Sequence, residues 1–128
     1  MALTNHERVG KALDLLRDGL APFIEREFTS RYESKALAEA RRFVVDERVA
    51  AKKKLAQWDV NALLRLVWEG WNEVFKQTLG HAERSLVSEL REVRNQWAHQ
   101  ETFSSDDADR ALDSVERLLT AVSAGEAE

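Results

Sequence analysis

Cysteine is absent from this chain of 128 residues, and only one proline and five glycines interrupt it. The lack of cysteine excludes disulfides, a thiolate nucleophile and a cysteine-ligated metal. No apolar run approaches the ~18 to 20 residues that cross a bilayer. The first ten residues also lack the basic region and apolar stretch of a secretory signal. We therefore expect a cytoplasmic protein without membrane association.

The charge balance argues against one class of function. Lysine and arginine number 19 against 23 aspartates and glutamates, a net charge of −4. A protein that coats nucleic acid regardless of its sequence usually needs a strong positive field. A local basic site is still compatible with this balance. Three cationic clusters are present, and a solvated helix face is the simpler interpretation of each: Arg41 and Arg42; Lys52, Lys53 and Lys54; Arg91 and Arg94.

What is present indicates helices. Hydrophobic residues make up 44% of the chain and charged residues 33%, as in a globular domain. No segment alternates between polar and apolar residues for long. We expect an all-α protein, a compact bundle of four to five helices, in a single domain covering residues 1–128 with a flexible tail from about residue 123.

The first helix has a clear start and an ambiguous middle. Thr4 and Glu7 fit a capping box, and apolar residues at helical spacing extend the helix to about Phe28. Pro22 falls inside it, so we expect a kink near residues 18–21 or, alternatively, two shorter helices.

Two further helices follow with less certain limits. Residues 34–57 are rich in helix formers and predict a charged, partly exposed helix. Asp59 is then a credible N-cap and Gly80 a credible C-cap. The apolar face between them is wide and includes Trp71, which indicates a central helix or an oligomer interface.

A fourth helix over residues 81–98 and a last helix complete the bundle. The last helix follows "FSSDD", where Ser104 or Ser105 is the expected N-cap.

Arg94, Asn95 and His99 stand at the end of the predicted fourth helix, in the string "RNQWAH". On a regular helix Arg94 and His99 would lie ~140° apart. Either they are unrelated, or the helix ends near Ala98 and His99 leaves the cylinder; the loop-like "QETFSS" favours the second. Simple capping of the helix dipole is the plainer interpretation of both side chains.

Other chemistry has little support. His6 and His81 are not accompanied by other candidate metal ligands, and no histidine pair has the spacing of a helical zinc motif. A phosphate-cradling glycine-rich loop and a nucleophile elbow are also missing. We expect no metal and no cofactor.

The motif and its surroundings resemble a known family. "RNQWAH" resembles the signature of the HEPN superfamily (higher eukaryotes and prokaryotes nucleotide-binding), an arginine followed after four to six residues by a histidine. "LREVRNQWAHQETFSSDDADRALDSVERLL" and "NHERVGKALDLLRDGLAPFIERE" are similar to the branch typified by the Swt RNA-surveillance endoribonuclease. That branch also occurs at the N-terminus of large bacterial defence and helicase proteins. The resemblance is strongest at both ends of the chain and weak over residues 30–57.

The resemblance implies a helical bundle that forms a homodimer, in which the motifs of two protomers face one another, and metal-independent RNA cleavage in active members. It makes Arg94 the motif arginine, Asn95 the polar residue after it and His99 the motif histidine. An imidazole can move the protons of such a reaction, and a guanidinium can clamp phosphate oxygens. Arg91 and the three lysines, Lys52, Lys53 and Lys54, are the candidate RNA-binding residues.

Three hypotheses follow for the function. The chain is an endoribonuclease in RNA processing, toxin action or phage defence; or a binding module that holds RNA or pairs larger polypeptides, such as the N-terminal part of a defence or ATPase protein; or a structural bundle. The expected partners are RNA and a second copy of the chain, with an antitoxin or a larger polypeptide as further candidates.

Overall fold

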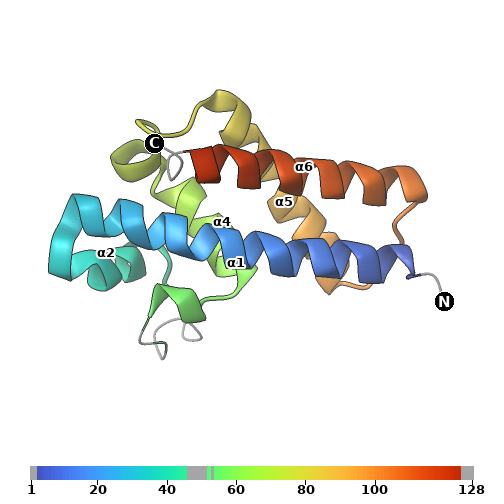
Figure 1. Ribbon diagram of the computed structural model, residues 1–128. Helices are drawn as coiled ribbons and strands as arrows, with labels where there is room; N and C mark the ends of the chain where they lie inside the picture. The colour runs from blue at the N-terminus through green and yellow to red at the C-terminus, as the bar shows by residue number, and fades with distance from the viewer. Residues whose placement is uncertain (1–2, 46–51, 53, 125–128) are drawn as a thin grey trace.

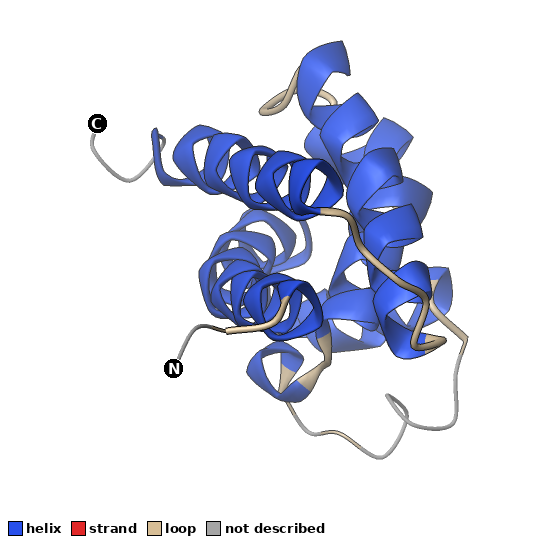
Figure 2. Ribbon diagram, turned by 90° about the vertical axis from the view of Figure 1, so that its right-hand side faces the viewer, coloured by secondary structure: helices blue, strands red, loops and turns tan. Residues whose placement is uncertain are grey.

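The computed structural model describes residues 3–45, 52 and 54–124, and these form the predicted all-α bundle (Figures 1 and 2). Five α-helices and three short 3-10 or π turns make up the described part, and no strand occurs in it. None of its helices has the length and apolarity needed to cross a membrane. The tail from residue 125 and Lys53 lie outside the described residues.

Helix α1 (Asn5–Tyr32) begins at the predicted capping box. The Glu7 amide donates to Thr4 Oγ1 at 3.1 Å, and the Thr4 amide donates to Glu7 Oε1 at 3.4 Å. The alternative of two shorter helices is wrong, because Pro22 lies inside one continuous helix that runs past Phe28. The proline removes one backbone hydrogen bond, but the apolar residues on both sides of it are buried on the same face of the helix. A kink near residues 18–21 stays a prediction.

The predicted helix over residues 34–57 is wrong. A 3-10 turn (Glu33–Lys35) leads into α2 (Ala36–Phe43), and a second 3-10 turn covers Leu55–Gln57. Val44 has an extended backbone (φ −122°, ψ 96°) and is 1% exposed. Helix propensity alone therefore does not determine the conformation of this segment. Val44 is buried in an extended conformation, and this ends the helix.

Helix α4 (Val60–Glu69) starts as predicted, since the Ala62 amide donates to Asp59 Oδ1 at 2.8 Å. It does not reach Gly80. A π turn (Trp71–Phe75) follows Gly70, and Gly80 is the N-cap of the next helix, so its prediction as a C-cap is wrong. The π turn places Trp71 in the core at 4% exposure, which excludes it from an oligomer interface.

The last two helices fix the layout of the bundle. Helix α5 (His81–Ala98) packs against α4 and α6, and α6 (Ser105–Ala124) lies side by side with α1 (Figure 1). Ser104 caps α6: the Asp107 amide donates to Ser104 Oγ at 3.0 Å. Helices α1 and α6 run parallel, because Arg8 pairs with Asp109 near their starts and Arg26 bonds the Val122 carbonyl near their ends. The start of α1 therefore lies beside the loop that joins α5 to α6.

Glu89 of α5 accepts hydrogen bonds from Arg110 and Ser114 of α6. We expect these bonds to make the fold less stable at low pH. Burial alone would raise the pKa of Glu89, but hydrogen bonds from Ser114 and Arg110 and the Arg110 charge outweigh it, so that pKa lies below its ordinary value. Such a carboxylate stabilises the fold above its unfolded-state pKa of ~4.3, and the contribution is lost as the pH falls through the folded-state value.

We expect Glu89→Gln to lower the free energy of unfolding by about 1 kcal/mol at neutral pH and to flatten its decline below pH ~4.3. Urea unfolding of wild type and variant over a pH series measures both effects. A decline as steep in the variant as in the wild type would assign the acid sensitivity to other carboxylates.

Candidate active site

The motif lies where α5 ends. The helix stops at Ala98, and His99 is its C-cap with φ −89° and ψ 10°; its amide still donates to the Asn95 carbonyl at 3.0 Å. Gln100 then takes a left-handed conformation (φ 60°), which turns the chain away from the helix axis. The predicted stop near Ala98 is confirmed.

The three motif side chains are available to a ligand. Asn95 and His99 are exposed and Arg94 is half-buried. Over residues 3–45, 52 and 54–124, none of these side chains makes a hydrogen bond or an ion pair. Arg94 and His99 therefore do not contact each other through a polar bond within one chain. A fixed cation and a titratable imidazole without intramolecular partners can both act on a substrate.

The first turn of α1 contacts the end of α5 through His6. Its ring stacks on Trp97 with the centroids 5.2 Å apart and the planes 10° from parallel. Two reciprocal hydrogen bonds join the same residues: His6 Nε2 to the Trp97 carbonyl at 3.1 Å, and Trp97 Nε1 to the His6 carbonyl at 3.2 Å. Because a carbonyl only accepts, His6 Nε2 carries the proton. This contact, the His6–Trp97 clasp, fixes the backbone two residues before His99.

A second set of bonds fixes the backbone after His99. Asn5 Nδ2 donates to the Phe103 carbonyl at 3.0 Å, and Gln96 Nε2 donates to the Thr102 carbonyl at 3.2 Å. Arg8 supports Asn5 with a 3.3 Å hydrogen bond. The His99 segment is thus held at both of its ends while its imidazole stays exposed.

Gly10 permits this close approach of α1 and α5. A Cβ atom added there would lie 2.9 Å from Trp97 Nε1, closer than real Cβ contacts. A side chain at residue 10 would therefore push the indole away from His6.

The other predicted site residues are only partly brought together. Arg91 lies on α5 one turn before Arg94 and Asn95, and is half-buried. Lys52 and Lys54 are exposed, but they precede the 3-10 turn that packs on α1, away from the helix that carries the motif. Lys53 lies outside the described residues. No hydrogen bond or ion pair joins Lys52 or Lys54 to the motif, and their assignment as RNA-binding residues stays a prediction.

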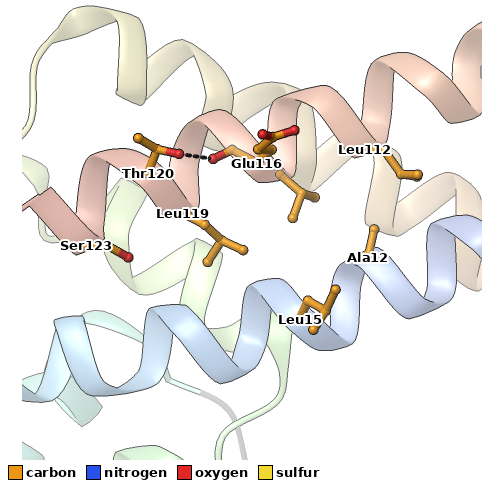
Figure 3. Close-up of a pocket in the computed structure, with 8 residues that line it drawn as sticks. Ala12, Leu15, Leu112, Glu116, Leu119, Thr120 and Ser123 are labelled. Carbon is orange, nitrogen blue, oxygen red and sulfur yellow. Dashed lines mark hydrogen bonds between the residues drawn. The ribbon is translucent and has the colours of Figure 1, made fainter.

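An apolar groove lies between α1 and α6 (Figure 3). It encloses about 690 Å³, and Leu15 on its rim is 62% exposed. Aliphatic residues form most of its lining, and its three polar members, Glu116, Thr120 and Ser123, all lie on α6, whereas a catalytic site requires polar groups that converge. In the described part of the chain, no group of three or more histidine, aspartate or glutamate side chains is placed to hold a metal ion.

The fold and the motif together define a bundle with an arginine and a histidine at the end of its penultimate helix. The family model of the Swt1-like HEPN domains matches residues 11–123. The chain belongs to this family, as its resemblance predicted. Comparison with curated proteins and with solved structures gives no match. Asn5, His6 and Arg8, which hold the His99 segment, lie just before the matched range.

Proposed function

We propose that the chain is a metal-independent endoribonuclease that acts as a homodimer through Arg94, Asn95 and His99. The observation that carries the proposal is the exposed His99 imidazole, which has no partner among the described residues and stands on a backbone segment held by bonds on either side of it. A residue that only capped the helix would need no such support. RNA processing, toxin action and phage defence are the roles in which this activity would serve, with an antitoxin or a larger polypeptide as its regulator.

The reaction is an internal transfer at phosphorus. The RNA 2′-oxygen attacks the adjacent phosphorus and loses its proton to a neutral imidazole. The bond from phosphorus to the 5′-oxygen breaks, and an imidazolium gives that oxygen a proton. The products carry a 2′,3′-cyclic phosphate and a 5′-hydroxyl. Arg94 meets the charge of the phosphorane with two parallel N–H groups, and Asn95 orients the phosphate or the His99 of its own chain.

A homodimer supplies what one chain lacks. The reaction uses one basic and one acidic imidazole, whereas each chain offers one histidine at the end of α5. Two copies related by a two-fold axis at this end would bring two histidines and two arginines to one cleft. The net charge of −4 favours a second candidate, a non-catalytic HEPN module that pairs larger polypeptides.

Total RNA incubated in EDTA with wild type, His99→Ala and Gln77→Ala, an exposed control in the turn before α5, tests the proposal. We expect wild type and the control to yield fragments ending in 2′,3′-cyclic phosphate, and His99→Ala to yield at least ~100-fold fewer. Equal cleavage by His99→Ala would reject the proposed site. No cleavage by any of the three, with a dimer in sedimentation, would favour the module.

A further inference from the structure

A polar and cationic stripe runs along α5 to the motif. Its members follow spacings of three and four residues: His81, Arg84, Ser88, Arg91 and Asn95, with His99 four residues later. At 100° per residue they stay within a narrow sector of the helix, on the side opposite the buried Leu90. Glu92 borders this α5 stripe, and Glu89 is turned toward Arg110 of α6. The stripe gives an acidic chain a local positive surface.

The first half of the stripe borders a pocket. The Arg84 pocket, as we name it, encloses about 290 Å³ and is lined by one residue of α4 and four of α5: Trp68, His81, Arg84, Ser85 and Ser88. Its lining offers a guanidinium, an imidazole and two hydroxyls, and contains no acid. That set of donors suits a phosphate group.

Arg84 is held in the pocket without satisfying its own donors. Its guanidinium carbon lies 4.2 Å from the Trp68 ring centroid and 5.5 Å from that of Trp71. Its Nε is covered and has no hydrogen-bond partner, and within the described part of the chain the side chain makes no ion pair. Stacking on an indole fixes the plane of a guanidinium and leaves its N–H edge free for an anion. The terminal N–H groups of Arg84 are not covered and have no partner in the described part of the chain, so they can donate to a ligand oxygen.

We infer that the Arg84 pocket binds a backbone phosphate of single-stranded RNA, and that the strand follows the α5 stripe from this pocket to His99. The inference rests on the proposed function for the identity of the strand. Fifteen helical residues separate Arg84 from His99, or ~22 Å along the axis. A few nucleotides span that distance, so the pocket holds the strand away from the scissile bond and adds affinity without taking part in the reaction.

Ser88→Glu tests the pocket with little risk to folding, because Ser88 is exposed. It is made in a His99→Ala background, so that the RNA stays intact, and compared with Ser34→Glu, the same change at an exposed position between α1 and α2. The probe is a fluorescein-labelled single-stranded RNA followed by anisotropy. We expect Ser88→Glu to raise Kd about tenfold and Ser34→Glu to leave it within about twofold.

A second variant, Arg84→Gln, measures the phosphate contact itself. Loss of one phosphate contact is expected to make the slope of log affinity against log salt shallower by about 0.7. Equal affinities for Ser88→Glu and Ser34→Glu, or an unchanged salt slope in Arg84→Gln, would overturn the inference. The two proposals fail separately: cleavage by wild type with unchanged binding in the pocket variants rejects only the pocket, and weakened binding in those variants without cleavage by wild type rejects only the nuclease.

Discussion

Arg94→Ala is expected to slow RNA cleavage by about 10²- to 10³-fold, the usual loss when one donor to a developing negative charge is removed. The free energy of unfolding should change little, within about 0.5 kcal/mol. The reason is structural: the Arg94 guanidinium has no hydrogen bond or ion pair within the described part of the chain, so its removal breaks no intramolecular bond. Single-turnover cleavage and urea unfolding of the same preparation measure the two quantities.

Arg94→Lys separates the charge of this side chain from its shape. Lysine keeps the positive charge and the apolar stem but loses the planar pair of donors, so we expect a rate between those of wild type and Arg94→Ala. Arg117→Ala and Arg117→Lys are the matched controls, because Arg117 is exposed on α6 and paired with Asp113 at 2.8 Å. A wild-type rate in Arg94→Ala would remove Arg94 from the reaction, and a wild-type rate in Arg94→Lys would show that charge alone suffices.

The features that the sequence predicted well are local ones. The caps at Thr4, Asp59 and Ser104 each join residues three apart, so the donor and its acceptor stand in one short string. The end of α5 is local too, since the loop signal follows His99 directly. Arg94, Asn95 and His99 could be chosen as candidates because the family signature is itself a short string.

The features that the sequence did not predict depend on distant partners. The limit of α2 follows from burial of Val44, and the interruption after α4 from the way Gly70 and Trp71 pack into the core. His6 lies 91 residues from Trp97, and the sequence shows it only as one residue of a first turn. Arg84 does not stand out in the sequence for the same reason: its placement depends on Trp68 of another helix.

The cationic clusters also differ between what the sequence shows locally and what the fold brings together. Lys52 and Lys54 are conspicuous in the sequence, yet they belong to the segment that packs on α1. Arg84 belongs to none of the clusters and lies seven residues before Arg91, but helical geometry aligns the two on one face with Asn95. Under the proposed function, a cation aligned with the motif would contribute more to RNA binding than a denser group of cations elsewhere on the chain.

His6→Ala is expected to lower the free energy of unfolding by about 2 kcal/mol. It removes one of two donors to the Trp97 carbonyl, the His6 ring N–H at 3.1 Å, while the Gln100 amide still donates at 3.2 Å, and it removes the stacked ring at 5.2 Å. A double-mutant cycle with Trp97→Phe, measured by urea unfolding, should give a coupling energy of about 1 kcal/mol. Lys11→Ala, an exposed change one turn further along α1, is the control and should leave stability unchanged.

His6→Ala should also slow cleavage by the protein that remains folded. At a temperature where the variant is fully folded, we expect kcat to fall about tenfold with KM nearly unchanged, because the clasp positions the backbone before His99 and does not bind RNA. His6→Gln retains an amide donor that can reach the Trp97 carbonyl and should recover part of the rate. If the folded His6→Ala protein kept the wild-type kcat, the clasp would serve stability alone. In that case, the bonds from Asn5 and Gln96 to the loop after His99 would suffice to position the imidazole.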